Sequence, residues 1–368
     1  MVLFKKLLLP TRLCHGPFSE YSTNLPGLLS DISVLDLTRV VAGPFCTMTL
    51  GDLGANVIKV ESLEGDEARK WGPPFIEGSK DSFYYLAVNR NKKSICINLK
   101  SPEAAMGGLL NATGERNGNP CKPGIAITDL TTGLHGFGAV MAALYYRQKT
   151  GKGQKIDCNL LSTQISSMIN LASIYLNCGI ECERWGTAHA NLVPYQAFNT
   201  KDGDLVIGTG SNAQFADFCK LIGKEELSND DRFKDNSDRV KNRDECIRII
   251  SEVIKTKTSK EWTEIFKTAS FPNGPVNKMS DVFADEHVKA IELVKELPHP
   301  DCGTVKLVGP PTVYSEGGNY ARTAPPTLGQ HTKDDGPTPE PTTTVTLRPD
   351  ESPPAPAPPD KDKPSTSE

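Results

Sequence analysis

Apolar and polar positions near the start of the chain follow first a strand period and then a helix period. In the stretch 31–61, DISVLDLTRVVAGPFCTMTLGDLGANVIKVE, two short runs rich in apolar residues, 34–37 and 56–60, flank a segment with helical spacing. Pro44 stands where that helix would begin, and Gly54 stands where it would end. Two strands joined through a helix form a βαβ unit, so the pattern predicts a parallel sheet at the front of the protein.

A second helical pattern lies in the middle of the chain, in the stretch 123–144, PGIAITDLTTGLHGFGAVMAAL. Its apolar residues recur at intervals of three and four, which predicts a helix from about 130 to 146. The stretch holds a single carboxylate, Asp129, and Thr128 or Asp129 is a candidate N-cap. Glycines at 133, 136 and 138 weaken a helix and indicate that something approaches this backbone closely. From residue types alone, Asp129 is therefore either a helix cap or a functional acid.

The remaining pattern predicts more of the sheet and a smaller region. We expect a strand at 154–158 with a long helix after it, and a returning strand or hairpin in 297–315. The smaller region should contain a strand at 204–208, a helix at 212–222 and a charged helical stretch at 238–255. The fold class is α/β: a Rossmann-like parallel-sheet large domain (31–194, returning at 297–332) and a smaller α+β domain (195–296).

Both ends of the chain differ in composition from the rest. Residues 1–30 form a leader that carries Lys5, Lys6 and Arg12 but no acid before Glu20. A basic, hydroxyl-bearing and acid-poor leader is typical of mitochondrial transit peptides, which predicts a protein of the mitochondrial matrix. Residues 333–368 are rich in Pro, Thr and Ser and cannot bury a core, so we expect this tail to be disordered.

The composition of the 368 residues excludes several classes of protein. A formal net charge of −4 gives no reason to expect a nucleic acid or a membrane surface as partner. No apolar run approaches the length of a membrane span. The ten cysteines show neither a CxxC pair nor a zinc spacing, so they indicate thiols of a reducing compartment and no metal site.

Two features have both a structural and a functional interpretation. Arg90, Lys92 and Lys93 form a compact basic segment that is either a solvated turn or a phosphate-binding edge. The aromatic residues of WGPPF and PYQAF are more typical of a core than of a ligand site.

A third feature resembles a nicotinamide-binding turn. Gly208, Gly210 and Ala213 have GxGxxA spacing between a predicted strand and a predicted helix. The motif lies in mid-chain and no second βα repeat follows, so we interpret it as a packing turn.

Seven ordered motifs between residues 31 and 332 carry a family resemblance. They are VLDLTRVVAGPFCTMTLGDLGANVIKVE, GDEARKWGPPF, NRNKKSICINLKSPE, TDLTTGLHGFGAVMAAL, KTGKGQKIDCNLL, RWGTAHANLVPYQAF and PPTLGQHT. Together they closely resemble the class III coenzyme A (CoA) transferases, the CaiB/BaiF family. The resemblance implies an interlocked homodimer that moves CoA from an acyl-CoA such as succinyl-CoA to a carboxylic acid such as glutarate. It implies no cofactor or metal, since the CoA thioester is itself a substrate.

The resemblance also implies roles for particular residues. Asp129, the acid of the TDL motif, would be the nucleophile that carries CoA as an aspartyl thioester. The family's CoA contacts fall on Val41, Ala42, Ile97, Asn98, Leu99 and Lys100. The acyl and acceptor pocket would be formed by a loop of Gly186, Thr187, Ala188 and His189, although His189 also fits an ordinary surface histidine.

This chain departs from the family pattern in two places. Ser62 stands where the family has an arginine that contacts CoA, and Lys93 or Arg69 could replace that contact. A family block with part of the sheet is missing after about residue 103, which predicts weak CoA binding. Two alternatives stay open: a catalytically impaired splice variant or mis-assembled gene product that acts as a binding or dimer partner, and a racemase-like enzyme that uses a His/Asp pair.

Overall fold

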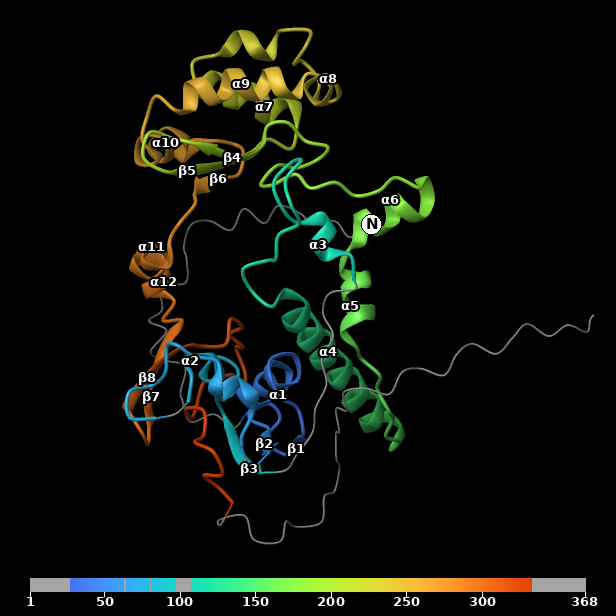
Figure 1. The fold of residues 1–368 in the computed structure, drawn as a ribbon, viewed down its shortest axis with the longest axis vertical. Coiled ribbons are helices and arrows are strands. Elements are labelled where there is room, and N and C mark those ends of the chain that lie inside the picture. The colour runs from blue at the N-terminus through green and yellow to red at the C-terminus, as the bar shows by residue number, and fades with distance from the viewer. Residues whose placement is uncertain (1–26, 63, 80, 97–106, 333–368) are drawn as a thin grey trace, which may run out of the picture. The chain divides into compact units, whose positions relative to one another are not determined.

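The computed structural model describes residues 27–62, 64–79, 81–96 and 107–332 (Figure 1). The expectations for the leader, for Ile97–Lys100 and for the tail fall largely or wholly outside these residues. The described residues form two compact units. The first holds residues up to 96 together with 126–164 and 294–332, and the second holds 107–125 and 165–293. No helix in the described ranges is long and apolar enough to cross a membrane.

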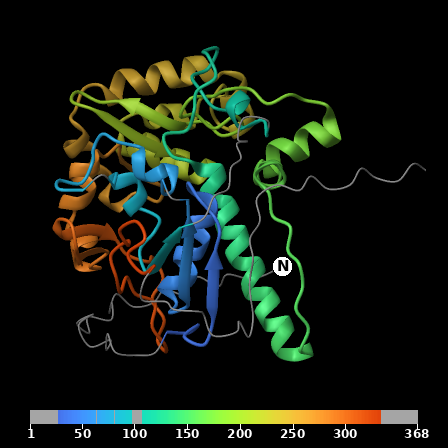
Figure 2. The same cartoon turned by 60° about the horizontal axis from the view of Figure 1, so that its bottom comes forward.

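The first unit is built on three parallel strands, as the βαβ pattern predicts. The strands are β1 (Ser33–Asp36), β2 (Asn56–Glu61) and β3 (Lys92–Cys96), hydrogen-bonded in that order. Helix α1 (Ala42–Asp52) connects β1 to β2, and the 3-10 helix η2 (Glu67–Lys70) and the short helix α2 (Phe83–Leu86) precede β3. The strands run alongside the long helix α4 (Ile127–Thr150) in Figure 2.

That long helix, α4 (Ile127–Thr150), packs on α1 in the first unit. Val34 of β1, Leu50 of α1 and Val140 of α4 lie in one buried apolar cluster. A second cluster joins Leu86 of α2 to the antiparallel hairpin of β7 (Val294–His299) and β8 (Gly303–Val308). The hairpin expected in 297–315 is therefore present, beginning three residues earlier.

One face of the parallel sheet is polar but buried. Asp36, Lys59 and Ser94 are register partners on neighbouring strands, and all three are fully buried. Glu61 and Lys92, two residues from Lys59 and Ser94, lie on the same face and are also buried. Charged groups in such a place must be paired, and Lys92 pairs with Asp36 while Glu61 pairs with Arg69.

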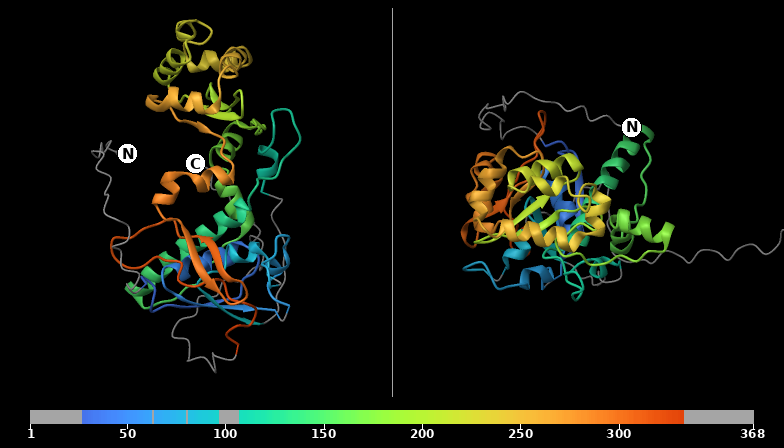
Figure 3. Two further views of the ribbon diagram at one scale, coloured as in Figure 1. Left: turned by 90° about the vertical axis from the view of Figure 1, so that its left-hand side faces the viewer. Right: turned by 90° about the horizontal axis from the view of Figure 1, so that it is seen from above.

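The second unit contains an antiparallel sheet of β4 (Tyr195–Asn199), β5 (Asp204–Gly208) and β6 (Asn273–Pro275), in that order. Helices of this unit lie beside the sheet (Figure 3). The apolar core joins strand residues to helix residues, among them Phe218, Ile250 and Trp262. The helices of this unit are α3 (Leu109–Ala112), α6 (Ile169–Cys178), α7 (Asn212–Leu221), η3 (Glu225–Ser228), α8 (Asn236–Lys241), α9 (Arg243–Ile254), α10 (Ser259–Ile265), η4 (Phe266–Thr268), α11 (Met279–Ala284) and α12 (Glu286–Ala290).

The segment after α4 differs from its prediction. The strand expected at 154–158 is wrong, because these residues have no regular secondary structure and Lys155 and Asp157 form an exposed ion pair. Alternating polarity builds a strand only where a partner strand can accept its backbone hydrogen bonds. The long helix expected next is interrupted at Met168, which separates α5 (Leu160–Ser167) from α6.

Candidate active site

Asp129 lies in the first turn of α4. The helix begins at Ile127, and the residue at the N-cap position is Ala126, which has no side-chain capping bond. The Thr128 hydroxyl instead donates to Oε1 of Gln164 at 2.5 Å. The interpretation of Thr128 or Asp129 as the N-cap is therefore wrong, because the helix starts one turn earlier than its apolar spacing indicates.

The carboxylate of Asp129 is half-buried and forms none of the ion pairs found among the described residues. Burial raises the pKa of Asp129, and a hydrogen bond from its own backbone N–H lowers the pKa in part, with a net increase. A carboxylate that is short of stabilising partners is a better nucleophile than one held by a guanidinium or an ammonium group. The surroundings of Asp129 therefore suit an acid that reacts.

Two of the three glycines of α4 face α1. A Cβ atom at Gly133 would stand 2.7 Å from the carbonyl oxygen of Ala42, and one at Gly136 would stand 3.5 Å from Sγ of Cys46. A Cβ atom at Gly138 would have no neighbour within 4 Å. The close approach indicated by the sequence is therefore made by the start of α1.

Val41 and Ala42 form the start of α1. Val41 is the N-cap residue with a buried side chain, and Ala42 is the first helical residue. The N–H groups of this first turn have no acceptor within the helix, which makes the turn a suitable site for an anion. Since Gly133 lies one helical turn after Asp129, on the same face of α4, its contact with Ala42 brings this turn to the side of the helix that carries the acid.

Tyr84 is a candidate site residue that the sequence analysis missed. Burial raises the pKa of Tyr84, and the nearby Asp129 carboxylate raises it further, so the phenol and the acid are close enough to interact. Trp71 packs edge-on against Tyr84, with ring centroids 5.2 Å apart. Both side chains are exposed, at 46% for Trp71 and 41% for Tyr84. Phe75 is exposed as well, so the core interpretation of the WGPPF aromatic residues is wrong.

The basic residues proposed as phosphate contacts are mostly engaged inside the protein. Arg90 pairs with Asp52 at 2.5 Å, and Lys92 pairs with Asp36 at 3.0 Å. Arg69 pairs with Glu61 at 2.7 Å and donates to the Tyr85 hydroxyl. The phosphate-edge interpretation is therefore wrong for Arg90 and Lys92, and Arg69 cannot replace the family's arginine, because all three side chains are buried. Lys93 is half-buried, and its role stays a prediction.

The loop of Gly186, Thr187, Ala188 and His189 belongs to the second unit. Gly186 has a φ of 60° and donates its N–H to the carbonyl of Gly114, while the Thr187 hydroxyl accepts from the backbone N–H of Ala197. The His189 ring stacks on Tyr195, and its Nδ1 accepts from the N–H of Asn191. The loop is thus shaped by its own unit, and the pocket role implied by the resemblance stays a prediction.

The GxGxxA segment is a packing turn. Strand β5, which ends at Gly208, lies between two antiparallel partners, unlike the parallel strands that form nicotinamide sites. The N–H of Gly210, which would face a phosphate in such a site, donates to Oε1 of Gln214 at 2.8 Å.

A sequence model of CoA-transferase family III matches residues 29–105 and 104–332 of this chain. Human succinyl-CoA:glutarate CoA-transferase is 41% identical over 370 aligned positions, which cover 83% of this chain and 84% of the human protein. The succinate–glutarate CoA-transferase of Agrobacterium fabrum is 31% identical, with 82% of this chain and 93% of that protein covered.

Among solved structures, a CaiB/BaiF family protein from Brucella suis is similar with a TM-score of 0.73 and 32% identity, covering 84% of this chain and 98% of that chain. The chain belongs to CoA-transferase family III, and it is an enzyme of the CoA-transferase class. The two family matches meet at residues 104 and 105, close to the position where the sequence predicts a missing block.

Proposed function

We propose that this enzyme transfers CoA between succinyl-CoA and glutarate, with Asp129 as the nucleophile. The observation that carries the proposal is the half-buried Asp129 carboxylate with a raised pKa, one turn from the place where α4 meets the start of α1. The two relatives described above, named for succinate or succinyl-CoA and for glutarate, support the choice of substrates.

The chemistry proceeds through four exchanges at one acid, two for each substrate. The Asp129 carboxylate attacks the thioester carbonyl of succinyl-CoA, which forms a mixed anhydride and releases the CoA thiolate. The thiolate then attacks the aspartyl carbonyl of the anhydride, which leaves an aspartyl-CoA thioester and free succinate. Glutarate repeats the sequence in reverse and leaves as glutaryl-CoA. One thioester replaces another throughout, so no ATP is required.

Val41 and Ala42 are the CoA contacts of this proposal within the described residues, and Ile97–Lys100 complete the set outside them. The free N–H groups at the start of α1 suit a phosphate or a developing oxyanion. Gly186, Thr187, Ala188 and His189 form the proposed loop for the acyl group and the acceptor.

We further propose a homodimer in the mitochondrial matrix. Exposed apolar side chains support the dimer, and the most exposed of them are Ile169 (73%) and Leu176 (80%) on α6.

The test of the reaction is to trap the aspartyl-CoA thioester. After incubation with succinyl-CoA, mass spectrometry should find CoA on the peptide that contains AITDLTTGL, and hydroxylamine should remove it. Asp129→Asn should abolish the adduct. Asp157→Asn is the matched control, because Asp157 is an exposed acid of the same unit, and it should leave the adduct unchanged.

Labelling of the wild-type chain is expected to be partial, because the block missing after about residue 103 would supply further CoA contacts. A folded wild-type chain that neither binds CoA nor forms the adduct would support the impaired alternative. Incorporation of solvent deuterium at the carbon next to the thioester would support the racemase-like alternative. A monodisperse monomer in light scattering would reject the dimer. If residues 1–30 fused to a fluorescent protein left that protein in the cytosol, the matrix location would be rejected.

A further inference from the structure

The loop between β1 and α1 contains a strained residue. Val40 has a φ of 67°, in the left-handed region, where its β-branched side chain is unfavourable. It directly precedes Val41 and Ala42, so its conformation sets the direction in which the first turn of α1 presents its N–H groups. Such a conformation persists only where surrounding contacts hold it.

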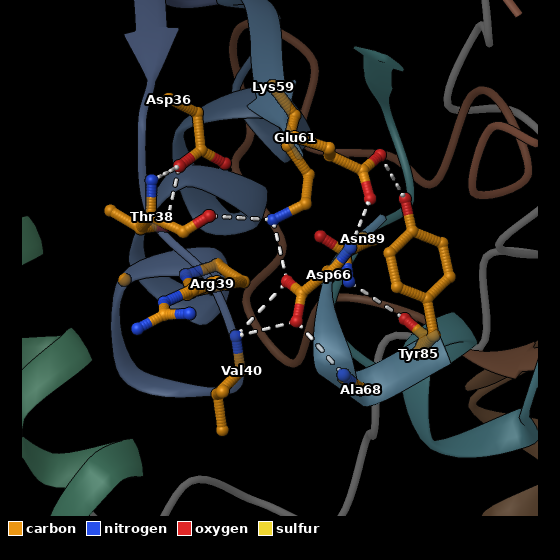
Figure 4. A network of polar contacts seen from close by, with 12 residues as sticks. Asp36, Thr38, Arg39, Val40, Lys59, Glu61, Asp66, Ala68, Tyr85 and Asn89 are labelled. Carbon is orange, nitrogen blue, oxygen red and sulfur yellow. Dashed lines mark hydrogen bonds and ion pairs between the residues drawn. The ribbon is translucent and has the colours of Figure 1, made fainter. Parts of the chain in front are cut away.

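A buried ion pair supplies those contacts (Figure 4). The N–H of Val40 donates to both carboxylate oxygens of Asp66, at 3.0 and 3.1 Å, and the N–H of Ala68 donates to one of them at 3.0 Å. Nζ of Lys59 donates to Asp66 at 2.9 Å and to the carbonyl oxygen of Thr38 at 2.8 Å. The side chains of Lys59 and Asp66 have no exposed surface. The pair therefore holds the loop at two points, Thr38 and Val40.

The geometry requires an aspartate at position 66. Both of its oxygens accept hydrogen bonds, one from two backbone N–H groups and the other from an ammonium and a backbone N–H. Asparagine has the same shape, but its amide nitrogen is a donor and would face either an N–H group or the Lys59 ammonium. In either orientation of the amide, its nitrogen would thus face two of these donors.

We propose that Asp66 is a positioning residue for CoA binding: with Lys59 it locks Thr38 and Val40, and so fixes the orientation of the first turn of α1 at the proposed CoA site. This inference rests on the proposed function, because it takes Val41 and Ala42 as CoA contacts. Asp66 itself touches neither CoA nor the reacting atoms.

Asp52 provides a matched control at the other end of α1. It is the last residue of the helix, its side chain is 2% exposed, and its carboxylate accepts from Nε and Nη2 of Arg90 at 2.9 and 2.5 Å. Asp52→Asn thus weakens a buried ion pair at the end of α1, and Asp66→Asn weakens one beside the loop that precedes this helix. Only Asp66→Asn disturbs the loop that precedes Val41.

Two measurements on the full-length chain test the proposal. Titration calorimetry with free CoA should show a dissociation constant at least tenfold higher for Asp66→Asn than for wild type, and less than threefold higher for Asp52→Asn. Hydrogen–deuterium exchange without ligand should be faster in the peptide spanning 38–45 for Asp66→Asn only. Lys59→Gln removes the charge but keeps a donor, and should weaken CoA binding in the same direction. It provides a second test if Asp66→Asn does not fold.

Equal losses of CoA affinity in Asp66→Asn and Asp52→Asn would overturn the proposal, since they would show a general loss of stability. Unchanged exchange at 38–45 together with a dissociation constant within threefold of wild type would also overturn it. A wild-type chain that binds no CoA would instead refute the proposed function. The exchange measurement would then still decide whether Asp66 fixes the loop.

Discussion

Gly133 of α4 lies against Ala42 of α1 so closely that a Cβ atom at Gly133 would stand 2.7 Å from the Ala42 carbonyl oxygen. Real side chains do not approach a backbone oxygen to this distance, so the two helices can meet here only through glycine. The contact joins the helix that carries Asp129 to the turn that carries the proposed CoA contacts. A change at Gly133 should therefore affect both the helix that carries Asp129 and the first turn of α1.

Gly133→Ala is expected to destabilise the protein by about 1–3 kcal/mol, the usual cost of overpacking a close contact. Gly138→Ala is the control on the same helix, because a Cβ atom there meets nothing within 4 Å and alanine favours helix by about 1 kcal/mol. Urea unfolding of the two variants beside wild type measures the difference. A Gly133→Ala protein as stable as Gly138→Ala would show that α1 and α4 do not meet in this way.

Tyr84→Phe should lower the transfer rate while leaving stability nearly unchanged. The phenol is exposed, interacts with the Asp129 carboxylate and can donate to a developing oxyanion beside it. A hydrogen bond to a charged group contributes about 1.5–3 kcal/mol, so we expect a decrease in kcat of about tenfold or more. Phe83→Leu, on the same turn and 47% exposed, is the control and should keep kcat. Equal rates for Tyr84→Phe and wild type would exclude a role for the hydroxyl.

Asp36→Asn should reveal a pH-dependent part of the stability. Burial alone would raise the pKa of Asp36, but the ammonium groups of Lys92 and Lys59 and the hydroxyls of Thr38 and Thr47 hold it well below the usual value of 3.8. A carboxyl group with a lowered pKa in the folded state stabilises the fold above pH 3.8. This contribution is lost as the pH falls from 3.8 toward the folded-state pKa.

The free energy of unfolding should therefore differ most between wild type and Asp36→Asn above about pH 4, by about 3–5 kcal/mol, as expected for a broken buried ion pair. Denaturant titrations between pH 7 and pH 2.5 would measure this difference. The difference in the free energy of unfolding should become smaller as the pH falls toward 2.5. A difference that stays constant over this range would mean that Asp36 is not held as a buried carboxylate.

The sequence pattern predicted the order of strands and helices well where apolar spacing decides them. The βαβ unit, β5 and the hairpin of β7 and β8 follow directly from runs of apolar residues and from turn residues. The predicted start of α4 is three residues late, because Ile127 is partly exposed and is followed by the polar residues Thr128 and Asp129. The strand at 154–158 was wrong because periodicity does not show whether a partner strand is present.

The candidate site was less accessible to pattern analysis. Asp36 and Lys59 alternate with apolar neighbours, which normally indicates a solvated sheet face, yet both are buried and paired, as is Lys92 on β3. Only contacts between strands distant in sequence distinguish the two cases. Residue types mark Asp129 as either a helix cap or a functional acid, and the family resemblance favours the second role. Nothing in the local sequence places the Tyr84 phenol near that acid.

Asp129→Asn separates the two roles that a carboxylate can have at the start of α4. Because burial raises the pKa of Asp129 above its usual 3.8, the folded state disfavours the charged form. This destabilisation is absent below the unfolded-state pKa and complete above the folded-state pKa, so it is present at pH 7. The Asp129→Asn protein should therefore be as stable as wild type or more stable at pH 7, while CoA transfer is lost.

Asp157→Asn, an exposed change in the same unit, should alter neither the stability nor the transfer rate. Thermal unfolding and transfer assays on the same preparations would decide the question. If Asp129→Asn melts at a lower temperature but transfers CoA at the wild-type rate, the charge of Asp129 stabilises the helix dipole and another group is the nucleophile.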